Sequence, residues 1–149
     1  MSKLKKFQKM DRRGFTLIEL VIIIVILGIL ATQAIPTYLS LVNDAKKASA
    51  KANLGGLRSS ISVYYAYKAT PMGGESATWP TIALLTDQTT VLNGQIPDNP
   101  YTTNAAKNNV EVGTTLGSLP NASQGWAYKA ASGQIWLNTS TAGVSENNW

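Results

Sequence analysis

The residues that could do chemistry in this chain are few, and the clearest of them lies near the N-terminus. The 149 residues include no cysteine and no histidine. This excludes thiol nucleophiles and disulfides, and it removes the commonest general base and metal ligand. Glu19 is the single charged residue in the apolar run from Phe15 to Ile35. A carboxylate costs about 2.5–3.5 kcal/mol at the centre of a membrane span, so its presence here calls for a function.

The element that positions Glu19 is a predicted membrane helix. The 21 residues from Phe15 to Ile35 span roughly 30 Å as a helix, which is the thickness of the hydrocarbon core of a bilayer. Residues 1–14 hold six basic residues against Asp11, whereas residues 15–149 hold seven basic and seven acidic residues. The whole net charge of +5 therefore belongs to a basic leader, which places the N-terminus in the cytoplasm and argues against a nucleic-acid-binding body.

Three interpretations fit a basic leader that is followed by an apolar helix. A secretory signal peptide has the same order of regions, but residues 32–34, Thr-Gln-Ala, form a poor small-x-small cleavage site. A simple signal anchor is the second interpretation. In the third, the leader is removed and the apolar helix is kept. Glu19 favours the third, since neither a disposable signal nor a plain anchor has a use for a carboxylate.

The hexapeptide Gly14-Phe15-Thr16-Leu17-Ile18-Glu19 resembles the signature of the type IV pilin superfamily. The resemblance covers residues 10–40 and includes Gly28 and Pro36. It implies that a prepilin peptidase cuts between Gly14 and Phe15 and that the new amine of Phe15 is methylated. Glycine before the cut lets the backbone lie extended in a protease cleft.

The resemblance also implies an assembly role for Glu19, whose carboxylate would pair with the N-terminal amine of a neighbouring subunit. The alternative is a carboxylate that is satisfied within its own chain, by the amine of the same helix. Pro36 lacks a backbone donor for the carbonyl of Thr32, so we expect a kink there. By resemblance, the stretch from Gly28 to Pro36 can unwind in a filament.

Beyond Pro36 the sequence predicts an amphipathic helix as far as Lys68. One apolar stripe is spaced by three and four residues; it consists of Ala50, Leu54, Leu57, Ile61 and Tyr64. Residues 125–130 and 134–138 flank a turn at 131–133 and predict a β-hairpin, and Val110–Val112 is a plausible third strand. The expected fold is α+β, a long N-terminal helix packed on a small antiparallel sheet.

We therefore expect four regions and one structural function. The regions are a removed leader (1–14), a transmembrane and assembly helix (15–35), an amphipathic helix (36–68) and a β-rich head (69–149). The chain is expected to be no enzyme and to polymerise into a pilus-like filament for adhesion, motility or DNA uptake. The first alternative is a pseudopilin of a type II secretion system, and the second is a non-filament anchor protein with a binding head.

The resemblance further implies partners and a place in the cell. The partners are the peptidase, the membrane, identical subunits and an inner-membrane platform with a cytoplasmic ATPase. The precursor would cross the bacterial inner membrane once with a periplasmic head, and the filament would lie at the cell surface or in the periplasm. No cofactor is expected. Asp98 with nearby asparagines could supply calcium ligands, although calcium takes six to eight oxygens and the carboxylates are scattered.

Overall fold

The computed structural model describes residues 14–120 and 124–139. The predicted leader, apart from Gly14, therefore lies outside the described residues, as does the end of the predicted head. The chain divides into two compact units, residues 1–41 and 42–149, and each is described by itself. Helix α1, Leu17–Lys68, supplies residues to both units and matches the predicted helix closely at both ends.

The first unit contains the apolar part of α1, and none of its described side chains is buried. Every described residue from Gly14 to Leu41 is exposed; Phe15, for example, is 84% exposed. By length and composition this is a helix that can cross a membrane, and no part of its apolar window is covered. The helix continues through Gly28 and Pro36. Their role in a filament stays a prediction.

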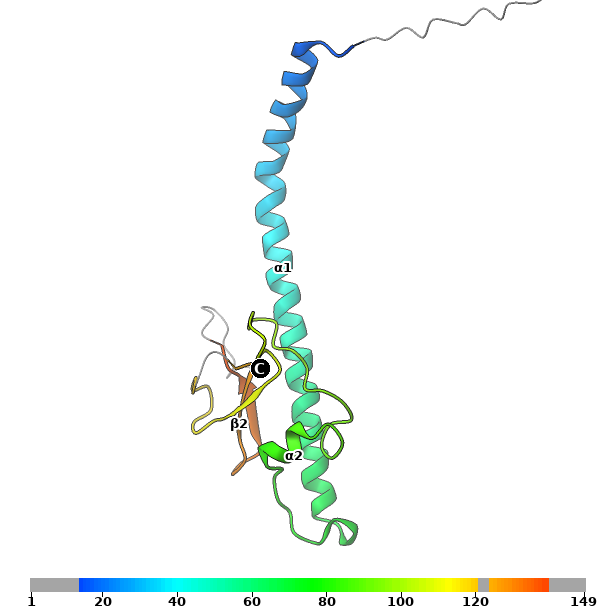
Figure 1. The fold of residues 1–149 in the computed structure, drawn as a ribbon, viewed down its shortest axis with the longest axis vertical. Helices are drawn as coiled ribbons and strands as arrows, with labels where there is room; N and C mark the ends of the chain where they lie inside the picture. The colour runs from blue at the N-terminus through cyan, green and yellow to red at the C-terminus, as the bar shows by residue number, and fades with distance from the viewer. Residues whose placement is uncertain (1–13, 121–123, 140–149) are drawn as a thin grey trace, which may run out of the picture. The chain divides into compact units, whose positions relative to one another are not determined.

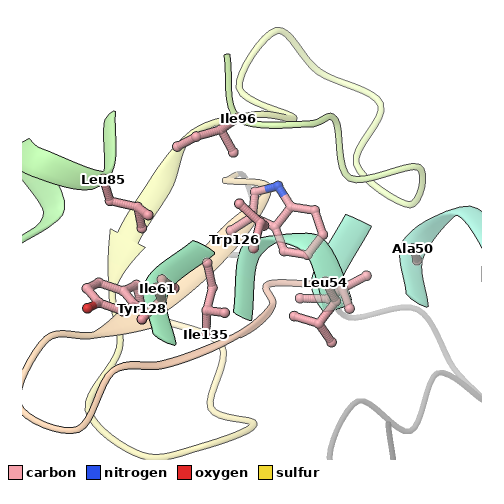
Figure 2. Close-up of a cluster of buried hydrophobic side chains, with 10 residues drawn as sticks. Ala50, Leu54, Ile61, Leu85, Ile96, Trp126, Tyr128 and Ile135 are labelled. Carbon is pink, nitrogen blue, oxygen red and sulfur yellow. The ribbon is translucent and has the colours of Figure 1, made fainter. Parts of the chain in front are cut away.

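The second unit is built around the predicted stripe on α1. Ala50, Leu54, Leu57 and Ile61 are each at most 1% exposed, as the three- and four-residue spacing predicts, and Tyr64 is half-buried. The four fully buried residues pack against the inner face of the sheet together with Leu85 and Ile96 (Figure 2). Each fully buried leucine or isoleucine contributes about 1.5–3 kcal/mol relative to an exposed one.

The sheet has three strands in the order β1-β2-β3, beside the last part of α1 (Figure 1). The strands are β1 (Val110–Val112), β2 (Trp126–Lys129) and β3 (Gln134–Leu137). The hairpin of β2 and β3 is antiparallel, as predicted. β1 pairs with β2 in parallel, so the expectation of a wholly antiparallel sheet is wrong. The connection from β1 to β2 returns to the same end of the sheet, which a tight hairpin turn cannot do.

Alternation along β2 and β3 divides their side chains between the two faces of the sheet. The cross-strand pairs Trp126–Leu137 and Tyr128–Ile135 belong to the core on α1. The intervening pair, Ala127 and Trp136, lies on the other face and is also fully buried. Trp136 packs over Gly113, where a Cβ would overlap its ring, and its Nε1 donates to the carbonyl oxygen of Ser118 at 2.8 Å. The loop after β1 therefore covers the second face.

Short elements and turns connect α1 to the sheet. A 3₁₀ turn, Pro71–Gly73, follows the end of α1 at Lys68. Helix α2, Ile82–Thr86, was not predicted, because five residues carry too little periodicity to be seen in the sequence.

Asn99 is fully buried; its Nδ2 donates to the carbonyl oxygen of Gly125, and its Oδ1 accepts from the backbone of Tyr101. Trp126 Nε1 donates to the carbonyl oxygen of Pro97 at 2.8 Å.

Burial of Tyr128 predicts that the second unit loses stability at alkaline pH. Its hydroxyl donates to the carbonyl oxygen of Pro80 at 2.8 Å, and burial raises the pKa of Tyr128 from 10.0 to about 12. Because the folded state binds this proton more tightly than the unfolded chain does, the contribution is intact below pH 10 and is lost as the pH rises toward about 12. Urea unfolding followed by tryptophan fluorescence measures it.

The Tyr128→Phe variant is expected to unfold at lower urea at neutral pH, because the Pro80 carbonyl loses its donor. That loss costs about 1–3 kcal/mol. The variant should then lose less stability than the wild type between about pH 9 and about pH 11.5. Tyr38→Phe, at an exposed position, controls for loss of a hydroxyl. Equal slopes of stability against pH in Tyr128→Phe and the wild type would contradict this account.

Candidate functional site

The candidate site is the N-terminus of α1, where Thr16 and Glu19 bind one another. Glu19 Oε2 accepts from the backbone N–H of Thr16 and from its hydroxyl, both at 2.8 Å. In return, the backbone N–H of Glu19 donates to Thr16 Oγ1 at 3.3 Å. Leu17 is the first residue of the helix, so Thr16 occupies the N-cap position and Glu19 the N3 position. This reciprocal pair is a capping box, and it satisfies two backbone donors that a helix start leaves free.

The capping box gives Glu19 a partner inside its own chain, but that partner is Thr16. The only partner predicted for Glu19 within its own chain was the terminal amine. The signal was in the sequence, because threonine followed three residues later by glutamate before an apolar run is the pattern of a capping box. A carboxylate at this end of a helix is also stabilised by the helix dipole.

The predicted cleavage position lies immediately before this capped helix start. Gly14 and Phe15 precede α1 and are exposed, and no other described residue approaches within 4 Å of where a Cβ on Gly14 would lie. The peptide bond between Gly14 and Phe15, where cleavage is predicted, is therefore exposed among the described residues. Gly28 and Pro36 lie within α1, nine and seventeen residues after Glu19, which is about 2.5 and about 4.7 helical turns, so they do not contact this group.

The structure gives Asp98, the residue considered for calcium, a different partner. Its carboxylate forms an ion pair with Lys107 Nζ at 2.5 Å, and about half of each side chain is exposed. Its backbone carbonyl accepts from Asn53 Nδ2 at 3.0 Å. Within residues 14–120 and 124–139, no three acidic, histidine or cysteine side chains gather as they would around a metal ion.

A family model described as the prokaryotic N-terminal methylation motif matches residues 9–32. The match contains the glycine, the capped helix start and most of the apolar segment, as far as Thr32. The chain carries the prokaryotic N-terminal methylation motif. The resemblance to the type IV pilin superfamily is thereby confirmed. This family consists of structural pilin and pseudopilin subunits, which are not enzymes.

Curated relatives extend the match beyond the motif. The chain is 36% identical over 73 residues to type II secretion system core protein G of Pseudomonas aeruginosa, covering 46% of this chain and 51% of that protein. It is 32% identical over 106 residues to the fimbrial protein EcpC of Eikenella corrodens, covering 71% and 64%. It is 43% identical over 54 residues to the type IV narrow pilus major component PilA5 of Thermus thermophilus, covering 36% and 47%.

These matches cover about half the length of the curated relatives. No solved structure matches the chain significantly. The relatives include both pilus subunits and a component of a secretion system, so likeness alone does not choose between these two roles.

The capping box makes a prediction about the first turn of α1. Thr16→Val keeps the shape of the side chain and removes the hydroxyl, which loses two of the three hydrogen bonds. Loss of an N-cap costs about 1 kcal/mol, so the amide of Glu19 should exchange with solvent about fivefold faster. Hydrogen exchange of the full chain in detergent micelles measures this. Thr16→Ser should exchange like the wild type, and equal rates for Thr16→Val would contradict the capping role.

Proposed function

We propose that this chain is a structural subunit that polymerises through the N-terminal half of α1 into a type IV pilus-like filament. A prepilin peptidase first cuts between Gly14 and Phe15 and methylates the amine of Phe15. The observation that carries the proposal is the apolar segment of residues 15–35, which is exposed throughout, with Glu19 in the first turn of its helix. The match of residues 9–32 to the N-terminal methylation motif supports the processing step.

The apolar segment must be shielded from water both in the membrane-bound precursor and in the assembled filament. In the precursor, lipid covers it, because a helix of this length and composition suits a bilayer. Outside the bilayer, exposure of so many branched aliphatic side chains to water is unfavourable. Identical helices from neighbouring subunits supply an apolar environment of the same kind, so extraction from lipid is offset by burial in a filament core.

Glu19 couples cleavage to assembly. Before cleavage the nitrogen of Phe15 belongs to a neutral peptide bond, and the Glu19 carboxylate has Thr16 as its partner. Cleavage converts that nitrogen into a cationic amine. A carboxylate in an apolar bundle then gains from a neighbour's amine, because a charge pair in low dielectric is favoured over an unpaired charge. Pairing of this kind sets the register between adjacent subunits.

The role of a type II secretion pseudopilin is the second candidate, and one observation favours it. The similarity to type II secretion system core protein G extends over 73 residues, well past the methylation motif. In that role the same helix-driven assembly would form a short periplasmic pseudopilus for protein export. In both roles the partners are the peptidase, an inner-membrane platform with a cytoplasmic ATPase, and copies of this chain. Neither role requires a cofactor.

Glu19→Gln separates the charge of this residue from its capping role. Glutamine at N3 still completes a capping box, but it cannot pair as an anion with an amine. We expect the variant to be cut and methylated normally and to give at most about a tenth of wild-type filaments, since loss of the pair exceeds about 1.4 kcal/mol. Intact mass reports the processing, and the yield of sheared filaments reports the assembly.

Two further variants complete the test. Glu75→Gln removes an exposed carboxylate of the second unit and should assemble like the wild type. Glu19→Ala removes both the charge and the cap and should assemble no better than Glu19→Gln. Normal filaments from Glu19→Gln and Glu19→Ala would refute the pairing mechanism, whereas a wild type that forms no filaments would leave the anchor role.

A further inference from the structure

A polar pocket lies in the second unit, along the edge strand β1. Its volume is about 620 Å³, within the range of small-molecule sites. It is lined by α2, by the loop after α2, by residues 108–112 in and before β1, and by Gln124. β1 has β2 as its strand neighbour on one side only, and α2 contacts it. All of these elements belong to one compact unit.

The chemistry of the lining is dominated by carboxamides. Five of the lining side chains are amides, and they surround one carboxylate, that of Glu111; the amides are Gln88, Gln95, Asn108, Asn109 and Gln124. Each carboxamide offers two N–H donors and a carbonyl acceptor, whereas the ionised carboxylate only accepts. None of the residues that line the pocket is basic. The lining therefore suits a ligand that donates and accepts hydrogen bonds and carries no negative charge.

Two oxygens of this lining are shielded from solvent and accept no hydrogen bond within the described residues. They are Glu111 Oε2 and Gln124 Oε1. Glu111 lies in β1, and Gln124 lies two residues before β2. These two segments run side by side, because Val110 is in register with Trp126 and the Trp126 backbone N–H donates to the carbonyl oxygen of Asn109 at 3.0 Å. A buried acceptor without a donor is costly. Neither oxygen has solvent-accessible surface in the pocket, so its side chain must rotate toward the pocket before a ligand hydroxyl can supply the missing donor.

We propose that this pocket binds a neutral polyhydroxylated ligand of the size of a mono- or disaccharide unit. Hydroxyls donate to Glu111 and Gln124 and accept from the surrounding carboxamides. Ile82, Ile96 and Val110 offer apolar surface to the C–H faces of a sugar ring. Glu111 disfavours an anion, and a single carboxylate is a poor set for calcium, which takes six to eight oxygen ligands. The site lies in the second unit and does not depend on filament formation.

Ligand-observed saturation-transfer NMR tests the proposal on the full chain in dodecylphosphocholine micelles, which carry no sugar headgroup. The probes are glucose, galactose, N-acetylglucosamine and lactose, titrated to about 20 mM, so that binding in the millimolar range is seen. At least one probe should bind the wild type. Glu111→Gln should weaken that binding about tenfold, the loss expected for a charge-assisted hydrogen bond. Gln124→Ala should weaken it several-fold.

Two exposed side chains of the same types provide matched controls. Glu75→Gln and Gln134→Ala lie outside the pocket and should bind like the wild type. Tryptophan fluorescence checks that each variant folds, and Gln95→Ala replaces any variant that does not. Binding lost only in the pocket variants supports the site. The proposal would be overturned if none of the four sugars bound, or if binding were unchanged in the pocket variants. It would also be overturned if the protein responded to calcium alone, and the pocket would then hold only solvent or an ion.

Discussion

The whole molecule depends on an apolar helix surface that its own described residues do not cover. Branched aliphatic side chains project on all sides of α1 from Leu17 to Leu30, and water cannot stabilise such a surface. In our proposal, a bilayer covers it in the precursor, and a bundle of identical helices covers it in the filament. Glu19 is tolerated in this surface because Thr16 binds it before assembly, and because a neighbour's amine, in our proposal, binds it afterwards.

The second half of α1 buries one apolar stripe within the second unit. Its stripe, from Ala50 to Ile61, is spaced to meet one face of a small sheet. Two tryptophans and a buried asparagine fix the loops that join the sheet: Trp126 and Trp136 donate to loop carbonyls, and Asn99 binds the residue before β2. Specific polar contacts of this kind hold long loops where regular structure is scarce. They also position β1, on which the polar pocket depends.

The sequence predicted what periodicity and composition encode. The extent of α1, its buried stripe and the hairpin of β2 and β3 follow from spacing alone, and the cleavage motif follows from its six residues. The parallel pairing of β1 did not follow, because three residues carry no mark of strand direction. Helix α2 was too short to be seen. The capping box of Thr16 and Glu19 is encoded by residues three positions apart and could be predicted from them, whereas the pocket around Glu111 depends on residues that only the fold brings together.

Intact-mass analysis of the protein in sheared surface material and in the membrane pellet tests the central claim most directly. The account predicts a mature, N-methylated chain that begins at Phe15 and is abundant in the sheared fraction. The same mature mass confined to the membrane would favour the pseudopilin role or a minor subunit. A chain that retains Met1 in both fractions, or one that begins at Ile35, would contradict cleavage at Gly14 and the filament mechanism built on it.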